Sequence, residues 1–86
     1  MIVKVCYGSV DRKHQHNRIV ECSDIHVEDE ISERTGEIFS KVICHQGDKI
    51  VAELHLGTEF EDHMYVMDNG KTVDHITAYP RPANEE

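Results

Sequence analysis

Residues 64–75 read Met-Tyr-Val-Met-Asp-Asn-Gly-Lys-Thr-Val-Asp-His, and this stretch decides the fold class. Asn69 and Gly70 suit the two positive φ angles of a type I′ turn, which closes a hairpin with two loop residues. The flanking segments 64–67 and 72–79 are rich in β-branched and aromatic side chains, as strands are. The sequence therefore predicts an antiparallel hairpin centred on Asn69 and Gly70.

The register of this hairpin follows from its two-residue turn. Met67 is expected opposite Thr72, and the preceding residues of the first arm then pair in step with the following residues of the second. Because side chains alternate between faces, this register places His63 and His75 on opposite faces. The Pro-Arg-Pro sequence at 80–82 is expected to end the pairing, since proline donates no ladder hydrogen bond.

The composition extends the strand prediction to most of the chain. The 86 residues include eight Ile and nine Val but only two Leu and three Ala. β-Branched side chains pack well on a pleated surface and lose rotamers in a helix. A continuous apolar run predicts a first strand at Ile2–Tyr7. The polar residues 11–17 predict a connecting loop, and residues 18–27 predict a second strand that pairs with the first.

A further hairpin is predicted from residues 37–45 and 49–56, which Gln-Gly-Asp joins at 46–48. Pairing across a three-residue loop separates the apolar side chains from most of the polar ones, which supports this register. The first face is expected to hold Ile38, Ser40, Val42 and Cys44 opposite Leu56, Leu54, Ala52 and Ile50. The second face is expected to pair Phe39 with His55 and Lys41 with Glu53.

These segments together predict a single, mainly β domain at residues 1–80, followed by a mobile tail at 81–86. About six antiparallel strands in consecutive hairpins would form a curled sheet, a small barrel or a sandwich. The acidic segment near residues 28–35 is expected to form at most one short helix, since Gly36 suits the residue after a helix end. A domain of this size has a thin core, so we also expect a homo-oligomer.

The net charge of −8 is unevenly distributed along the chain. Residues 1–20 hold four cationic side chains and one acid, whereas residues 21–37 hold seven acids and one arginine. An overall negative field repels phosphate backbones, which argues against direct binding of nucleic acid. The charge favours a basic protein partner instead.

The sequence also bears on the cellular compartment. No run approaches the roughly 18 apolar residues that span a bilayer, and the N-terminus lacks the pattern of a secretion signal. Cys6, Cys22 and Cys44 are an odd number at unrelated spacings, which argues against a disulfide framework. We therefore expect a soluble, cytoplasmic protein with reduced thiols and no membrane contact.

Recognisable catalytic motifs are missing from the sequence. The glycines are isolated, so neither a phosphate-binding loop nor a dinucleotide fingerprint is present, and there is no Gly-x-Ser-x-Gly elbow. Paired carboxylates fall in predicted loops, where a solvated acidic surface is the ordinary arrangement. We expect a protein that is not an enzyme and has no cofactor.

The most unusual local composition is Asp-Arg-Lys-His-Gln-His-Asn-Arg at residues 11–18. Arginine binds phosphate or carboxylate through two parallel hydrogen bonds, and lysine acts as a point charge. This loop supports an alternative function, an oligomer that sequesters a phosphate-containing or nucleotide ligand. The candidate anion-binding residues are Arg12, Lys13, His14, His16 and Arg18.

Seven histidines raise a metal hypothesis that their spacing supports only weakly. Structural zinc commonly uses two close pairs of ligands, and only His14 and His16 form such a pair. No metal ligand is therefore predicted, and a metal-stabilised, histidine-rich protein is kept as a second alternative.

The acidic clusters carry the leading hypothesis. Carboxylates along a strand or loop can imitate the phosphates of a nucleic acid and occupy a basic groove. Small, acidic, strand-rich chains resemble in type the accessory inhibitors of phages and mobile elements, which include nucleic-acid mimics. We therefore expect a non-catalytic inhibitor or adaptor that covers the surface of a basic or nucleic-acid-handling protein. The candidate partner-binding residues are Glu28, Asp29, Glu30, Glu33, Glu59, Glu61, Asp62 and Phe60, with Phe39, Tyr65 and Tyr79 as further apolar anchors.

Overall fold

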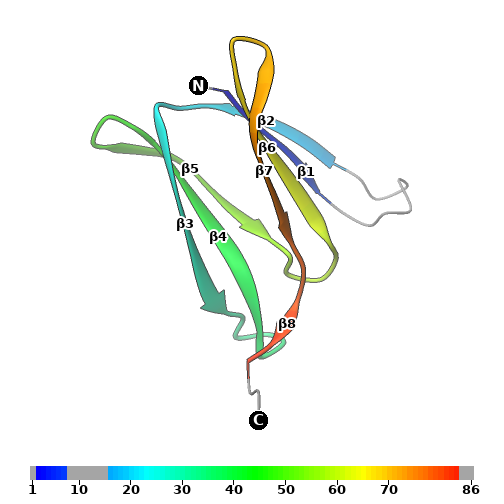
Figure 1. Ribbon diagram of the computed structural model, residues 1–86. Coiled ribbons are helices and arrows are strands. Elements are labelled where there is room, and N and C mark those ends of the chain that lie inside the picture. Colours follow the sequence, from blue (N-terminus) through cyan, green and yellow to red (C-terminus); the bar gives the residue numbers. More distant parts are fainter. Residues whose placement is uncertain (1, 8–15, 84–86) are drawn as a thin grey trace.

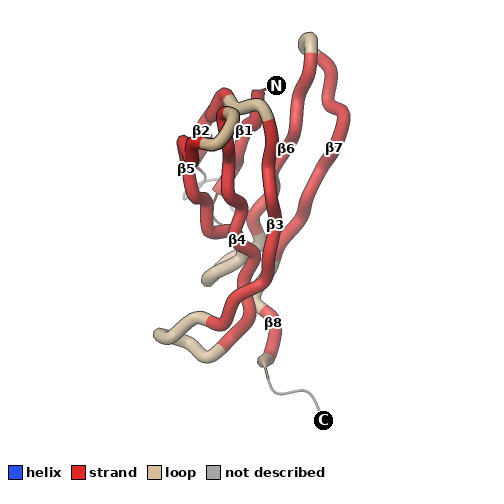
Figure 2. Tube along the Cα trace, turned by 90° about the vertical axis from the view of Figure 1, so that its left-hand side faces the viewer, coloured by secondary structure: helices blue, strands red, loops and turns tan. Residues whose placement is uncertain are grey.

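The computed structural model describes residues 2–7 and 16–83, which form strands and loops (Figures 1 and 2). All strand pairs are antiparallel, in two four-stranded sheets. Sheet A has the order β2-β1-β6-β7; sheet B has the order β3-β4-β5, with β8 also on β4. The mainly β prediction is confirmed. The strands are β1 Ile2–Tyr7, β2 His16–Glu21, β3 Asp24–Ile31, β4 Glu37–Gln46, β5 Lys49–Leu56, β6 Asp62–Asp68, β7 Lys71–Ala78 and β8 Arg81–Pro82.

The two sheets share one hydrophobic core. Alternate residues of the inner strands point into it, as the period of two in a strand requires. The buried set combines Val3, Val5, Val20, Met64, Val66 and Ala78 of sheet A with Val42, Cys44, Ala52, Leu54 and Leu56 of sheet B, and with Cys22 between them. Most of these side chains are small, so the core is thin.

The predicted pairing of the second strand with the first is confirmed, but its predicted extent of 18–27 is wrong, because two strands of different sheets occupy this stretch. β2 ends at Glu21 and β3 begins at Asp24. Cys22 is buried in the core, and the Ser23 backbone N–H donates to the His45 carbonyl at 2.8 Å. These contacts fix the crossover from sheet A to sheet B.

The acidic segment near residues 28–35, where at most one short helix was expected, forms no helix. β3 continues to Ile31, which pairs with Ile38, so the first half of the acidic segment is extended. A turn follows at 33–35, in which the Gly36 N–H donates to the Ser32 carbonyl. The ladder with β4 satisfies the backbone hydrogen-bonding groups of this stretch, and this favours the extended conformation over a single helical turn.

The middle hairpin has the predicted faces but a different register. Its turn contains Gly47 and Asp48 alone, and Ser40 pairs with Leu56 instead of Leu54. A shift of two residues leaves each side chain on its predicted face, so the buried set is largely the expected one. An irregularity at Cys44/His45 changes the turn end, where Ile50 is exposed instead of buried.

The last hairpin has the predicted turn, with φ of 52° at Asn69 and 77° at Gly70. Met67 pairs with Thr72 as expected, but a bulge then shifts the register by one residue. Beyond the bulge Tyr65 pairs with His75, and His63 pairs with Thr77. The one-residue shift turns each following side chain of β7 to the other face.

Strand pairing was predicted to end at the Pro-Arg-Pro sequence of residues 80–82, but it continues there. After Pro80 the chain crosses to sheet B, where Ile38 pairs with Arg81 and Glu37 pairs with Pro82. Proline is tolerated because this two-residue strand lies at an edge. The described chain continues to residue 83, and the rest of the predicted tail lies outside the described residues.

Candidate functional site

The fold brings together two acidic segments that are far apart in the sequence. The Arg34 guanidinium lies 3.2 Å from the Glu59 carboxylate and thereby joins the 33–35 turn to the 57–61 loop. A shallow surface depression of about 470 Å³ lies between these segments, lined by residues 30–34, Phe39, His55 and Thr58. We call the exposed acids of the two segments the acidic end and define it as Glu28, Asp29, Glu30, Glu33, Glu59 and Glu61; Glu30 and Glu33 line the depression.

Several carboxylates of the acidic end are ion-paired within the chain. Lys41 lies 3.7 Å from Glu28 and also pairs with Glu30. Asp29 pairs with Arg81 of β8 at 3.0 Å. The carboxylate side chains in these pairs remain 41–58% exposed, so they stay at the surface with fixed orientations and partly compensated charge.

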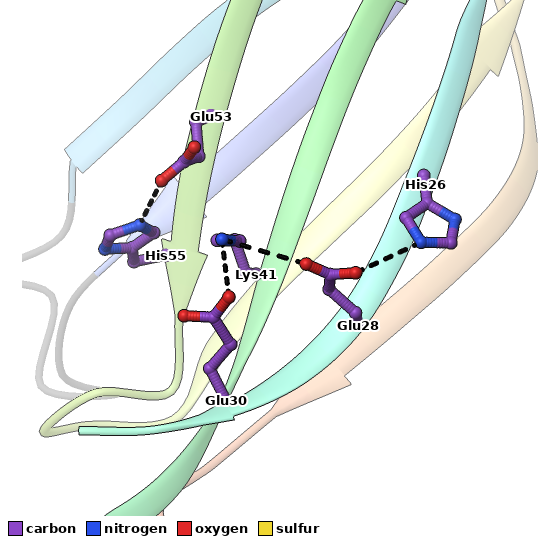
Figure 3. A network of polar contacts seen from close by, with 6 residues as sticks. All are labelled: His26, Glu28, Glu30, Lys41, Glu53 and His55. Carbon is purple, nitrogen blue, oxygen red and sulfur yellow. Dashed lines mark hydrogen bonds and ion pairs between the residues drawn. The ribbon is translucent and has the colours of Figure 1, made fainter.

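Lys41 is the centre of a polar network on the outer face of sheet B (Figure 3). Its hydrogen bond to Glu30 raises the pKa of Lys41, burial opposes this effect, and the surrounding carboxylates add to it. On the neighbouring strand, the hydrogen bond from His55 lowers the pKa of Glu53, and the charge of Lys41 lowers it further. The contacts join β3 to β4 through His26, Glu28, Glu30 and Lys41, and Glu53 and His55 form a separate pair within β5.

The apolar anchors predicted from the sequence differ in accessibility. Phe60 is 49% exposed beside the acidic end, and Tyr79 is also exposed. Phe39 is only 7% exposed because it packs near His55, with ring centroids 5.1 Å apart, so it is not available as a surface anchor. Tyr65 is half-buried on the outer face of sheet A, where it stacks on His75.

Asp62 differs from the other predicted partner-binding acids. Its side chain is 5% exposed, and one carboxylate oxygen accepts a hydrogen bond from the Gly57 backbone N–H at 2.7 Å. This bond closes the 57–61 loop. The structure thus gives Asp62 a role in holding the loop that carries Glu59, Phe60 and Glu61.

Most of the predicted anion-binding loop lies outside the described residues. Arg12, Lys13 and His14 are not described, and His16 is described only as the first backbone position of β2. Arg18 is exposed on β2, opposite Val5 of β1. The anion site stays a prediction.

The structure reveals a histidine cluster that sequence reasoning missed. His63 Nδ1 lies 3.0 Å from His75 Nε2, and the Thr77 hydroxyl lies beside both nitrogens. Tyr65 stacks on His75, with ring centroids 4.4 Å apart and 13° between the planes. The prediction that the two histidines lie on opposite faces is wrong, because the β7 bulge turns His75 toward His63.

The chain matches no protein-family model, no curated protein sequence and no solved structure. Within residues 2–7 and 16–83, no helix has the length and apolar character needed to cross a membrane.

Proposed function

We propose that this protein is a non-catalytic binding module, an inhibitor or adaptor that covers a cationic surface of a partner protein with its acidic end. The observation that carries the proposal is the Arg34–Glu59 ion pair, which joins the turn that carries Glu33 to the loop that carries Glu59 and Glu61. Glu30 and Glu33 line the depression beside this contact. Exposed Phe60 supplies an apolar anchor beside them. The mechanism is occupancy of the partner's surface.

Charge and order both support this function. A net charge of −8 attracts a basic partner over distance and raises the association rate. The bonds of Glu30 to Lys41 and of Asp29 to Arg81 hold carboxylates in place before binding, which reduces the entropy lost on association. A protein that binds nucleic acid through a basic groove is a partner of this chemistry, since fixed carboxylates resemble spaced phosphates.

The test compares two charge reversals of equal size. The first double variant, Glu33→Lys with Glu59→Lys, changes the acidic end. The control, Asp48→Lys with Asp68→Lys, changes the turn that follows β4 and the last residue of β6. Each tag-free chain is immobilised and exposed to source-cell lysate, and bound proteins are quantified by mass spectrometry. The partner is then purified for association kinetics at several salt concentrations.

We expect the wild-type chain and the Asp48/Asp68 variant to capture the same basic protein, and the Glu33/Glu59 variant to associate at least tenfold more slowly. Equal capture by all three chains would refute the role of the acidic end. Equal loss in both variants would show that net charge, and not this site, controls binding.

The proposal includes a cytoplasmic location and self-association. Cys6, Cys22 and Cys44 are free thiols, which suits a reducing compartment. Ile19 and Val73 are more than 60% exposed on the two edge strands of sheet A, where a second copy would cover them. Native mass spectrometry of the tag-free chain measures the subunit count.

A further inference from the structure

Three atoms that can act as metal ligands, from His63, His75 and Thr77, lie close together in a triangle on the outer face of sheet A. His63 Nδ1 and His75 Nε2 are 3.0 Å apart, and Thr77 Oγ1 lies 3.2 Å from the first nitrogen and 3.4 Å from the second. His63 belongs to β6, whereas His75 and Thr77 belong to β7. The bulge in β7 aligns the two histidines, so the triangle is a product of the fold.

These separations match the spacing of ligand atoms around one metal ion. An ion with metal–nitrogen bonds of about 2.0–2.1 Å holds tetrahedral ligands about 3.3 Å apart and right-angled ligands about 2.9 Å apart. All three sides of the triangle lie within or close to this range. The two ring centroids are 5.2 Å apart and the ring planes differ by 25°, so the nitrogens face each other. An ion can contact both once each ring turns about its side-chain bonds, without a large movement of either strand.

Neighbouring groups also prepare the two rings for a metal. His63 Nε2 lies 2.8 Å from a Glu61 carboxylate oxygen, so we assign the ring proton to Nε2 and the lone pair to Nδ1. A carboxylate that accepts from the remote ring nitrogen is the usual second partner of a metal-binding histidine. The stacked Tyr65 ring restrains His75.

We propose that His63 Nδ1 and His75 Nε2 bind one divalent transition-metal ion, of the class of Zn²⁺, Ni²⁺ or Cu²⁺. Imidazole nitrogen suits these ions, and the Thr77 hydroxyl and water complete the coordination shell. In the metal-free pair, the Nε2–H of His75 donates a hydrogen bond to His63 Nδ1. When the metal binds, His75 carries that proton on Nδ1 instead, so the total proton count is unchanged.

The proposed site is open and exchangeable. Within the described part of the chain, no three His, Cys, Asp or Glu side chains converge as a closed structural site would require. The inference does not rest on the proposed function. Glu61 belongs to both regions, but the variants Glu33→Lys and Glu59→Lys leave Glu61 and the two histidines unchanged, so the two proposals can fail separately.

The experiment titrates the full-length, metal-free chain with zinc chloride. Calorimetry measures affinity, and nitrogen-15 NMR of the histidine rings reports which nitrogens bind. In the wild-type chain we expect the ring signals of His63 and His75 to move together and before those of the other histidines. This measurement needs no variant, so a folding defect cannot obscure it.

Variants then test the ligand set by affinity, with far-UV circular dichroism to show that each one folds. We expect His75→Ala to weaken zinc binding at least tenfold. The matched control is His26→Ala with His55→Ala, which removes two exposed histidines from sheet B and should change affinity less than twofold.

Three results would overturn the proposal. The first is unchanged zinc affinity in His75→Ala, and the second is an equal loss in His14→Ala with His16→Ala, which would place the ion in the basic loop. The third is an equal loss in Cys6→Ser, because Cys6 lies opposite His63 in the register and a thiolate ligand would replace the assigned set.

Discussion

Gly57 provides a sharp test of how sheet B meets the end of β7. Its φ angle is +75°, and a Cβ atom added there would lie 2.7 Å from the Tyr79 backbone nitrogen and 2.8 Å from the Ala78 carbonyl carbon. Its N–H also donates to Asp62. Because the opposing atoms are backbone atoms, they cannot move aside as the end of a long side chain could.

The cost of Gly57→Ala has two parts. The first part is the backbone term. A left-handed backbone costs a residue with a Cβ about 1–2 kcal/mol, and about 0.4–1 kcal/mol is subtracted from this because alanine reduces the conformational freedom of the unfolded chain. The second part is steric: overpacking in a close contact adds about 1–3 kcal/mol. We therefore expect Gly57→Ala to destabilise the fold by about 2–4 kcal/mol in total.

Two matched substitutions isolate the steric part. Gly36 and Gly47 have φ angles of +76° and +64°, but nothing lies within 4 Å of an added Cβ. Gly36→Ala and Gly47→Ala should therefore cost only the backbone term, about 1 kcal/mol each. Urea unfolding followed by circular dichroism measures all three. A cost for Gly57→Ala equal to that of Gly47→Ala would refute the close approach of residue 57 to the β7 end.

Three further predictions follow from the core and the polar network. Leu56→Ala should destabilise the protein by about 3 kcal/mol in urea unfolding, because Leu56 is fully buried between the sheets. Since His55 lowers the pKa of Glu53, this carboxylate contributes stability that is present above its ordinary pKa and is lost as pH falls through the lowered value; His55→Ala should raise the pKa of Glu53 in an NMR titration. Burial raises the pKa of Cys44 to about 11, so mass spectrometry should find the half-buried Cys6 alkylated by iodoacetamide long before Cys44.

Local signals in the sequence were enough to predict hairpins but not the division into two sheets. Asn69 and Gly70 determine their turn because few other residues accept both φ angles. The break at Cys22-Ser23 contains no glycine or proline, and its bonds run to His45, 22 residues away. The return of Arg81 to sheet B likewise depends on a distant strand.

The same distinction applies to the candidate sites. The acids were visible in the sequence, but their union depends on the contact of Arg34 with Glu59, which no local pattern encodes. The histidine pair was missed because a single bulge reverses the face of His75. A one-residue shift is invisible to an argument from alternation, although it decides whether His63 has a neighbouring ring.

Glu61 connects the two proposals, because it belongs to the acidic end and also accepts the His63 hydrogen bond. A metal ion on His63 would place two positive charges near this carboxylate and weaken attraction to a cationic partner. Thermodynamic linkage then requires the partner to lower the affinity for zinc by the same factor by which zinc lowers the affinity for the partner. Zinc titrations with and without the purified partner measure this coupling, which should decrease with salt because screening acts beyond about 8 Å. Independent binding of zinc and partner would contradict a shared role for Glu61.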